Sequence, residues 1–495
     1  MTATNLADLP LSHDPDHVAL VSRGRETTYA ELVRQIRAFR GGLVGLGVQA
    51  GDRVALLAGN SRHFVVAYYA TLGLGAVAVP LNPLAPAAEL QRELNEVGAC
   101  AVVVGPSAQS AWSAVARESI PSVQHVIDSE QFDAMLTSAQ PVLEAVINEN
   151  DLAVLIFTSG TAGAPKAAML SHGNLLANIN QVQAATPLAP SDIAFGVLPL
   201  FHIFGLNVVL GCAMACGATV VLIERFDPQS ALETIRDRKI TVMAGAPAMW
   251  AAMAHMPGVD HTSMSSLRLS ITGAAKMPED VAEALEARCG VQLAEGYGLT
   301  EASPVVTSAV FHEGHVITPR GSIGEVLNGV ELRLVDEDGD DAELGDPGEI
   351  WVRGPNVFGG YWRDPEATAR VLADDGWLRT GDIAVADDDG NLFIVDRAKD
   401  LIIVSGFNVY PAEVEAILAD HPGVARCAVV GVAHPHTGEA VKAFVVPAGA
   451  VPVDEDSIID FAHRFLSRYK CPSKVQFVDE LPVNVTGKVM RRALH

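Results

Sequence analysis

The chain has 495 residues, of which 49% are hydrophobic and 19% charged, and its formal net charge at pH 7 is −25. This composition is typical of a globular enzyme and excludes a disordered protein, and the length favours about three folded units over one core. The acidic balance argues against a general nucleic-acid binder, whose binding face would be basic.

The cysteines and the N-terminus bear on the compartment. The six cysteines are scattered, and none forms a CxxC pair or a Cys/His cluster with zinc spacing. This predicts buried free thiols and a reducing compartment. Residues 1–17 have neither a basic start nor an apolar stretch, so no signal peptide is expected. We therefore expect a cytoplasmic protein.

Residues 52–82 are predicted to form a strand, a helix and a second strand. Within them, residues 64–81 are uncharged over eighteen positions, which reaches the length of a membrane span. Gly73 and Gly75 divide this run into a helix-length piece and a Val-rich strand, and Pro80 ends it. A buried helix and strand are therefore expected instead of a transmembrane segment.

A buried strand predicted at residues 152–157 is followed by the loop TSGTAGAPK, residues 158–166. Small residues let backbone N–H groups approach an anion closely, so this loop could cradle a phosphate. The Walker P-loop requires a glycine directly before the lysine and Ser or Thr after it. Here Pro165 precedes Lys166 and Ala167 follows it, which removes the main support for a P-loop ATPase or a kinase.

Residues 191–224 repeat the strand–helix–strand pattern of residues 52–82, and both units end in G-A-x-x-V. Two related doubly wound subdomains are therefore predicted. A third alternation is predicted from a strand near 240–246, a helix at 279–289 and a strand that leads into EGYGLTEASPV, residues 295–305.

The turn after that last strand contains Tyr297, Thr300 and Glu301. An aromatic ring can stack on a purine, a hydroxyl can bind phosphate, and a carboxylate can hold Mg²⁺. On its own this turn is explained equally well as a structural element. In WLRTGD, the carboxylate of Asp382 after a glycine could accept both hydroxyls of a ribose, but such a segment on its own is more often a turn.

From about residue 320, short strands broken by acidic turns predict an antiparallel region with solvated hairpin tips at 336–341 and 386–390. The last hundred residues are predicted to form a compact α+β unit. It comprises a helix that begins at Pro411, two strands, a helix near 456–468 and a final strand near 473–481. A domain boundary is expected near residues 396–399.

Taken together, the order and spacing of these segments resemble the adenylate-forming superfamily of acyl-CoA synthetases, aryl-CoA ligases, luciferases and peptide-synthetase adenylation domains. The resemblance covers nearly the whole chain. GYGLTEASPV and KDLIIVSGFNVYPAEVE are most similar to the fatty acyl-CoA synthetase branch. The resemblance implies an α/β fold with an adenylating domain at 1–396, built of two doubly wound βαβ subdomains and an antiparallel β region. A small mobile α+β domain would follow at 397–495.

The resemblance also implies a role for each matching residue. The ATP triphosphate would be lined by Thr158, Ser159, Gly160, Thr161, Gly163 and Lys166. Adenine would lie between Tyr297 and the segment Gly273, Ala274 and Ala275, and the ribose would bind Asp382 with help from Arg397. Catalysis would use Thr300 at the α-phosphate, Glu301 as the Mg²⁺ ligand, Lys488 between carboxylate and α-phosphate, and His202 near the acyl site. Lys399 would be the hinge.

The implied reaction joins a carboxylic acid to ATP, which gives an acyl adenylate and pyrophosphate, and then to coenzyme A, which releases AMP. Uncharged surroundings of the acyl site favour a fatty acid, while an aryl or short-chain acid remains an alternative. So does a fatty acyl-AMP ligase that loads a carrier protein, and the non-enzymatic alternative is a nucleotide sensor. Contact with a membrane surface and a homodimer are left open, and no nucleic-acid partner is expected.

Two positions of the phosphate loop depart from the family. Ala162 stands where the family has Thr or Ser, and Ala167 stands where it has Gly. One hydrogen bond to a charged phosphate is worth about 1.5–3 kcal/mol at most. We therefore expect weaker binding of ATP and a functional enzyme.

Overall fold

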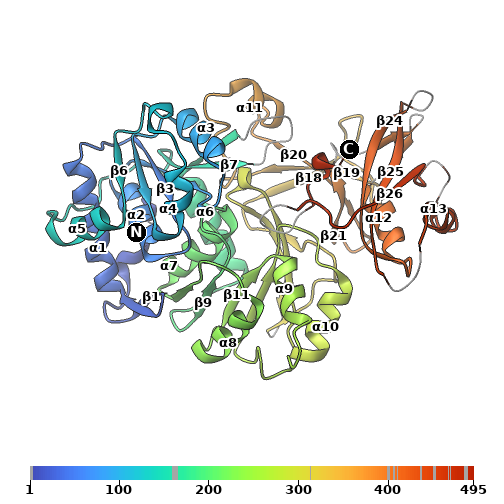
Figure 1. Cartoon of the computed structure of the whole chain (residues 1–495), viewed down its shortest axis with the longest axis horizontal. Helices are drawn as coiled ribbons and strands as arrows, with labels where there is room; N and C mark the ends of the chain where they lie inside the picture. The colour runs from blue at the N-terminus through green and yellow to red at the C-terminus, as the bar shows by residue number, and fades with distance from the viewer. Residues whose placement is uncertain are drawn as a thin grey trace.

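The computed structural model describes residues 4–158, 166–312, 314–397, 402–404, 407–409, 411–434, 438–449, 453–466, 468, 470–483 and 489–494. Side chains are described for all of these except residues 396, 397, 403, 407, 408, 438 and 492. A large part, at left and centre of Figure 1, precedes a smaller C-terminal part at right.

The first sheet has six strands in the order β6-β5-β3-β4-β7-β8, and only its last pair is antiparallel. The unit predicted at residues 52–82 is confirmed as β3, α2 and β4. The strands are β3 (Arg53–Leu57), β4 (Val77–Leu81), β5 (Ala101–Val104), β6 (His125–Ile127), β7 (Leu152–Thr158) and β8 (Lys166–Ser171). The helices around it are α1 (Tyr29–Gly45), α2 (Arg62–Gly73), α3 (Ala87–Val97), α4 (Gln109–Ser113) and α5 (Ser129–Ser138).

The second sheet has nine strands in the order β17-β14-β13-β12-β11-β9-β10-β1-β2. They are β1 (Val18–Ser22), β2 (Arg25–Thr28), β9 (Ile193–Gly196), β10 (Thr219–Leu222), β11 (Val242–Gly245), β12 (Leu269–Thr272), β13 (Ala294–Gly298), β14 (Val305–Ser308) and β17 (Glu325–Val326). Its helices are α6 (His172–Ala185), the π-helix η4 (Phe204–Gly211), α7 (Cys212–Cys216), α8 (Pro228–Arg238), α9 (Pro247–Ala254) and α10 (Glu279–Cys289). The second predicted unit is confirmed as parallel β9 and β10 with η4 and α7 between them.

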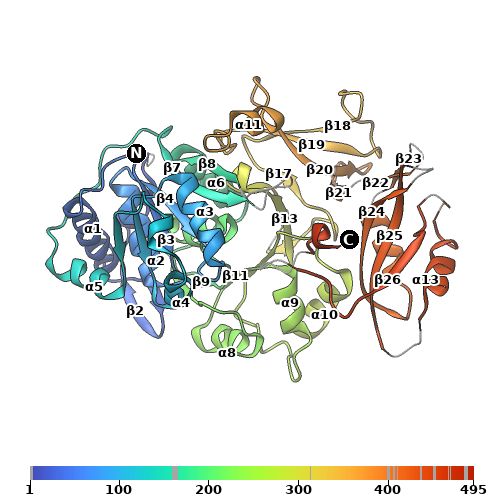
Figure 2. The same cartoon turned by 45° about the horizontal axis from the view of Figure 1, so that its top comes forward.

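The predicted antiparallel region is a four-stranded sheet in the order β18-β19-β20-β21, which lies towards the top of Figure 2. Its elements are β18 (Glu331–Val335), β19 (Gly348–Arg353), β20 (Leu378–Ala386), β21 (Leu392–Arg397) and α11 (Pro365–Val371). A separate two-stranded sheet pairs β15 (Phe311–His312) with β16 (His315–Val316).

The C-terminal part contains a five-stranded sheet in which β23-β22-β25-β24 are joined by β26 on β25. Its elements are β22 (Ile402–Val404), β23 (Phe407–Val409), α12 (Pro411–Ala419), β24 (Val424–His434), β25 (Gly438–Pro447), α13 (Glu455–Ala462) and β26 (Lys474–Phe477). Among the described residues there are also five 3₁₀ segments: η1 (Leu6–Ser12), η2 (Pro106–Ala108), η3 (Arg117–Ser119), η5 (Thr300–Ala302) and η7 (Arg491–Ala493).

The uncharged run at 64–81 is divided as predicted, since α2 ends at Gly73 and β4 begins at Val77. Gly75 adopts a φ of +77°, which permits the sharp turn between them. Residues 64–73 are buried, so the apolar composition of α2 reflects packing between sheet and helices. In the part of the chain that the structure describes, no helix is long and apolar enough to cross a membrane.

Three expectations need correction. The third alternation contains two further elements, α9 and β12, between β11 and α10. The helix predicted near 456–468 ends at Ala462, because the N–H groups of Arg464 and Phe465 bond to carbonyls three residues back and tighten the chain into a turn. The six cysteines are free, but only Cys212, Cys289 and Cys471 are fully buried.

Several strand ends meet at one edge, and this positions the functional site. β4, β7, β12 and β13 all end next to residues of one cavity, namely Asn82, Thr158, Gly273 and Leu299. Ligands of open α/β sheets bind at the carboxyl ends of parallel strands.

Candidate active site

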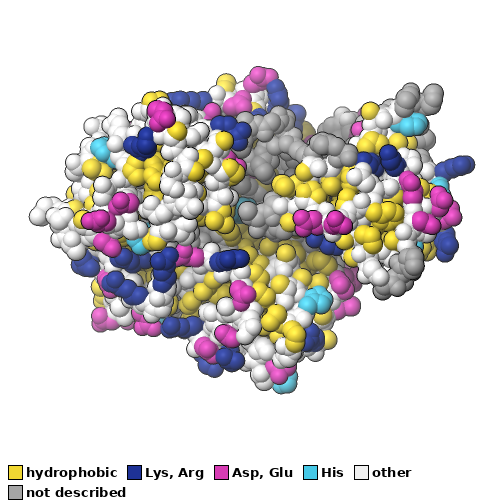
Figure 3. Space-filling model, in the orientation of Figure 1, with side chains coloured by type: hydrophobic (Ala, Val, Ile, Leu, Met, Phe, Trp, Pro, Cys, Tyr) yellow, Lys and Arg dark blue, Asp and Glu magenta, His cyan; other side chains and the backbone are white. Residues whose placement is uncertain are grey.

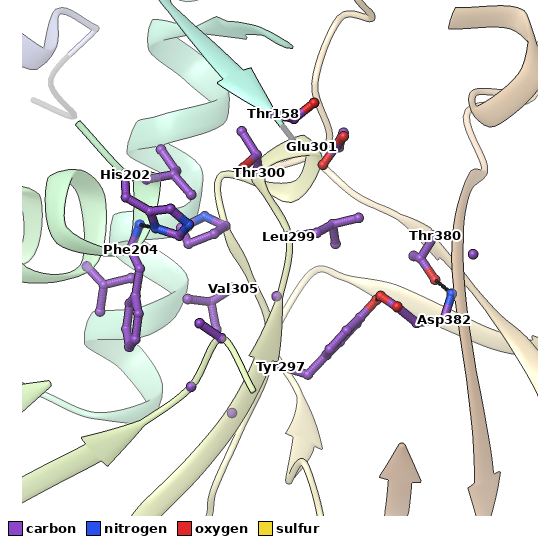
Figure 4. A pocket seen from close by; sticks show the side chains of 18 of the residues that line it. Thr158, His202, Phe204, Tyr297, Leu299, Thr300, Glu301, Val305, Thr380 and Asp382 are labelled. Carbon is purple, nitrogen blue, oxygen red and sulfur yellow. Dashed lines mark hydrogen bonds between the residues drawn. The ribbon is translucent and has the colours of Figure 1, made fainter. Parts of the chain in front are cut away.

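One large cavity, of about 1420 Å³, is lined by residues of the six-stranded, the nine-stranded and the four-stranded sheets and of the end of the chain. Figure 3 shows the surface hollowed between the large and the C-terminal part, and Figure 4 shows residues around the cavity. The cavity gathers nine of the predicted site residues: Thr158, Lys166, His202, Gly273, Ala274, Tyr297, Thr300, Glu301 and Asp382.

The remaining predicted residues are placed differently. Ala275 is exposed and does not line the cavity. Arg397 pairs with Asp382 through its backbone, and its side chain is not described. Val483 and Val489, which flank residues 484–488 and form a β-bridge, both line the cavity. The other predicted site residues lie outside the described residues: Ser159, Gly160, Thr161, Gly163, Lys399 and Lys488. The same is true of Ala162, which differs from the family at its position.

Tyr297 and Asp382 form one side of the cavity, at lower right in Figure 4. The Tyr297 hydroxyl donates to Asp382 Oδ2 over 2.7 Å, and the Asp382 N–H donates to Thr380 Oγ1 over 3.1 Å. Tyr297 therefore holds one carboxylate oxygen of Asp382 and Thr380 holds its backbone, and only 7% of the residue is exposed. The glycines beside Tyr297 are required, because a Cβ at Gly298 would lie 2.3 Å from the carbonyl oxygen of Pro304.

A second side of the cavity combines a cation with a carboxylate. Lys166 Nζ lies 3.5 Å from Asp364 Oδ2 and 5.3 Å from the centre of the Tyr361 ring. The Tyr361 hydroxyl donates to Glu301 Oε1 over 2.7 Å. Burial and the Glu301 carboxylate raise the pKa of Tyr361 well above its usual value, so the hydroxyl keeps its proton. Thr158 pairs with Lys166 in the antiparallel β7–β8 ladder, and residues 159–165 connect the two strands.

The third side contains His202 and Phe204 (Figure 4), and Val208, four residues after Phe204 on η4, also lines the cavity. Burial lowers the pKa of His202, so the imidazole is neutral near pH 7. Its Nδ1 accepts the Phe204 N–H over 3.3 Å, which leaves the proton of the neutral ring on Nε2. Gly273 permits close packing here, since a Cβ at this position would lie 3.3 Å from the Phe204 ring.

The residues present fit the expected Mg²⁺. Among the described residues, no group of three or more His, Cys, Asp or Glu side chains could hold a metal ion. Mg²⁺ keeps several waters and is usually bound by one or two carboxylates together with substrate phosphates. Glu301, whose Oε1 is held by Tyr361, supplies one such carboxylate beside Lys166, a cation suited to phosphate.

Sequence reasoning missed three residues that hold this site together: Tyr361, Asp364 and Thr380. Tyr361 and Asp364 lie in GYWRDP, which looks like an ordinary turn before a helix. The threonine of WLRTGD precedes the predicted Asp382 by two residues, and that spacing is the only available signal among the three.

Comparisons with known proteins show similarity to one enzyme family over almost the whole chain. The AMP-binding enzyme family matches residues 10–362, and the AMP-binding enzyme C-terminal domain matches residues 413–488. A feruloyl-CoA synthase from an Amycolatopsis species is 39% identical, with 96% of this chain and 95% of the relative covered. A long-chain-fatty-acid–CoA ligase from Yersinia pestis is 38% identical, with 97% and 91% covered. The solved structure of ATP-bound MatB from Rhodopseudomonas palustris matches with a TM-score of 0.92 and 33% identity, covering 99% and 98% of the two chains.

Proposed function

The chain belongs to the AMP-binding enzyme family and is an ATP-dependent acyl-CoA ligase, and we propose that it activates an apolar carboxylic acid at the large cavity. The observation that carries this proposal is the arrangement around the cavity. His202 and Phe204 lie on one side of the cavity, Tyr297 and Asp382 lie on another, and Glu301 lies between them and Thr158 (Figure 4). Lys166 also lines the cavity, and Tyr361 contacts both Lys166 and Glu301.

In this proposal each side of the cavity binds a different part of the substrates. Adenine packs against Tyr297 and the Gly273–Ala274 backbone, and the ribose hydroxyls bond to Asp382 with Arg397 nearby. Lys166, Thr158 and residues 159–163 hold the triphosphate. The acyl group lies against Phe204 and Val208, and the Nε2–H of His202 is available as a hydrogen-bond donor near the carboxyl end.

A carboxylate is a poor electrophile, because oxide would have to leave. Attack of the carboxylate oxygen on the α-phosphorus of ATP forms a mixed anhydride and breaks the bond to pyrophosphate. Two anions must meet in this step, so preorganised positive charge lowers the barrier. Glu301 would hold Mg²⁺, which supplies charge neutralisation at the phosphates. Thr300 would donate to the α-phosphoryl oxygen, and the ammonium of Lys488 would bridge carboxylate and α-phosphate.

The second step uses the thiol of coenzyme A, which attacks the acyl carbon and expels AMP. We propose that residues 1–396 and 397–495 form two domains hinged at Lys399, so that Lys488 can leave the acyl group before the thiol approaches. Val483, Val489 and Met490, which flank Lys488 in the sequence, line the cavity. This supports the proposal that the C-terminal part is arranged here for adenylation, the first step.

The acid is proposed to be apolar, because the side of the cavity near Phe204 and Val208 has no carboxylate that would bind an amine among the described residues. The relatives named above act, by their names, on feruloyl and long-chain fatty acyl groups. A fatty acid and an arylpropenoic acid are therefore both candidates for this chain.

A panel of carboxylic acids with ATP tests the proposal. AMP release would be measured with and without coenzyme A, for saturated fatty acids of increasing length, cinnamic-type acids and an α-amino acid. We expect AMP release that requires both coenzyme A and an apolar acid. Release that is independent of coenzyme A would contradict the ligase assignment, and preference for the amino acid would contradict the apolar acyl site.

A further inference from the structure

The proposed ribose ligand, Asp382, lies in an irregular part of strand β20. The antiparallel ladder between β19 and β20 is interrupted there, and the facing pairs on either side of the interruption are Glu349–Ile383 and Trp351–Arg379. Between these pairs, Ile350 alone stands opposite the three residues 380–382. β20 therefore bulges at the cavity, and bulges are found next to active sites because they change the direction in which a side chain points.

Side chains take the place of ladder hydrogen bonds within this bulge. The Gly381 N–H donates to Glu349 Oε1 over 2.8 Å, and the next N–H, that of Asp382, donates to Thr380 Oγ1 over 3.1 Å, the bond drawn between these residues in Figure 4. The Thr380 hydroxyl in turn donates to the carbonyl of Ile350 over 2.8 Å. Gly381 adopts a φ of +73°, which a glycine accepts without strain. Two successive N–H groups at Asp382 are thus held in place.

The second carboxylate oxygen of Glu349 also accepts a hydrogen bond from the protein. The indole Nε1–H of Trp351 donates to Glu349 Oε2 over 2.9 Å. The indole ring is held in turn by Arg379, whose guanidinium carbon lies 4.8 Å from the ring centre. Glu349 lines the cavity, but each of its oxygens is bonded to an N–H of the four-stranded sheet. Its effect on a bound nucleotide therefore passes through the bulge.

We propose that Glu349 is a positioning residue for the nucleotide, because its bond to the Gly381 N–H sets the direction in which Asp382 presents its carboxylate to the ribose hydroxyls. A binding group must be held within about 0.5 Å of its productive position by the residues around it. Glu349 does this for the main chain, and Tyr297 does it for the carboxylate through its bond to Oδ2. The inference rests on the proposed function, since Asp382 is the ribose ligand only within that proposal.

Glu349→Gln tests this role. Both partners of Glu349 are donors, and the amide of Gln has one acceptor and one donor, so it cannot serve Gly381 and Trp351 together. In ATP–pyrophosphate exchange we expect the KM for ATP to rise about tenfold, the change for one lost hydrogen bond. The KM for 2′,3′-dideoxy-ATP, which lacks both ribose hydroxyls, should stay within about twofold of the wild type. A merely structural role would raise both KM values alike.

A second substitution should restore the first. Trp351→Phe removes the indole N–H and keeps an aromatic ring for Arg379, so on its own it should leave both KM values within about twofold of the wild type. Combined with Glu349→Gln, it lets the amide turn its oxygen to Gly381 and its NH₂ group to the place of the lost donor. The KM for ATP of the double variant should therefore return to within about threefold of the wild type.

Two further variants separate position from charge and from loss of stability. Glu349→Asp keeps the charge and both acceptor oxygens but is one methylene shorter, so it should lower the ratio of the KM for dideoxy-ATP to that for ATP as Gln does. It also keeps the test independent of the Gln variant alone. Glu331→Gln is the matched control, because Glu331 lies on the neighbouring strand β18 and pairs with Arg353 over 2.6 Å. This control should leave the ratio unchanged.

The outcomes that overturn the inference differ from those that overturn the function. An unchanged KM ratio in both Glu349 variants, an equal rise for the two nucleotides, or a double variant that does not recover would each overturn the role of Glu349 and leave the ligase function intact. Equal KM values for the two nucleotides in the wild type would remove the ribose from Asp382 and end the inference with it. Absence of exchange with every acid in the wild type would instead contradict the proposed function.

Discussion

Tyr361 joins two charged side chains that come from distant parts of the chain. Its hydroxyl donates to Glu301, and its ring lies under Lys166, whose ammonium is also near Asp364. The segment around it is fixed by backbone hydrogen bonds, from Phe358 to Glu301 and from Trp362 to Ala167. Tyr361 is therefore a positioning residue for the proposed metal ligand and for the proposed triphosphate lysine.

Substitution of Tyr361 by Phe should separate its two contacts. The ring remains for Lys166, but Glu301 loses a donor over 2.7 Å and becomes free to rotate. We expect the Mg²⁺ concentration for half-maximal adenylation to rise about tenfold, while the KM for the acid stays constant. The measurement is ATP–pyrophosphate exchange across a Mg²⁺ titration.

Tyr361→Leu is the matched comparison, because it removes the ring as well as the hydroxyl. Tyr361→Leu should also raise the KM for ATP, because the aromatic ring over which the Lys166 ammonium lies is lost. If the Tyr361→Phe and Tyr361→Leu enzymes both had the Mg²⁺ dependence of the wild type, Tyr361 would have no part in positioning Glu301.

Lys488→Ala tests the proposed bridging cation. Removing one preorganised donor from a site where charge develops costs roughly 10²–10³ in rate. Adenylation should fall by about this factor, whereas thioester formation from supplied acyl adenylate should remain largely intact. Lys474→Ala, an exposed lysine on β26, serves as the control and should leave both steps unchanged. An equal loss in both half-reactions would assign Lys488 another role.

The sequence predicts those site residues that occur in motifs with fixed spacing. Glu301, Lys166 and Asp382 line one cavity, and each comes from a short segment with an identifiable chemistry, so the sequence could nominate them. Tyr361 could not be predicted, since its partner Glu301 is 60 residues away and an aromatic residue before a helix has no distinctive pattern.

At the scale of elements, the π-helix η4 shapes the apolar end of the cavity. Phe204 and Val208 both line the cavity, while Asn207 donates to the carbonyls of Leu175 and Ser303 and fixes η4 to its neighbours. Behind Val208 lies a second cavity of about 10 Å³. The wall between the two cavities is made of the residues that line both: Val182, Thr186, Val208 and Ile271.

This wall should limit the length of the acid. Val208→Ala removes two methyl groups from it and joins the small cavity to the large one. Longer acids should then gain relative to shorter ones, on the order of tenfold in the ratio of kcat/KM values, as expected for one or two methylenes in an apolar pocket. The measurement is kcat/KM for AMP release with a series of acids that differ by one methylene.

Val209→Ala is the matched control, because Val209 lines only the second cavity and loses the same atoms. Its chain-length preference should be unchanged. A similar shift in both variants would mean that general loosening of η4, and not the wall, sets the length.

Elements with a clear hydrophobic period were predicted well, and those that depend on tertiary packing were not. β3, α2 and β4 follow directly from the apolar run and from Gly75. The π-helical form of η4 has no sequence signal, since its apolar residues suit an α-helix equally. The early end of α13 at Ala462 depends on turn hydrogen bonds that the polar residues after it do not reveal.

At the scale of the whole molecule, the chain leaves one sheet and enters another between β21 and β22. The domain boundary expected from the sequence near residues 396–399 stays a prediction, and it lies at this change of sheet. How the two parts face each other could not be predicted, because few local signals encode contacts between distant surfaces. The structure brings Met490, Arg491 and Ala493 to the cavity, whose lining also includes residues of β20.

Lys399→Pro tests whether the two parts must reorient between the two reaction steps. Proline fixes φ near −65° and also restricts the residue before it, so a chain that must change its backbone angles at this position would be hindered. Adenylation should be affected little, because the C-terminal residues already line the cavity. Thioester formation, measured as single-turnover conversion of acyl adenylate by coenzyme A, should slow by about a factor of ten, which corresponds to roughly 1.4 kcal/mol in the barrier. Lys399→Ala removes the same charge but leaves the backbone free, so it should resemble the wild type in both steps. Equal slowing of the two steps by Pro would place the change of backbone angles elsewhere in the chain.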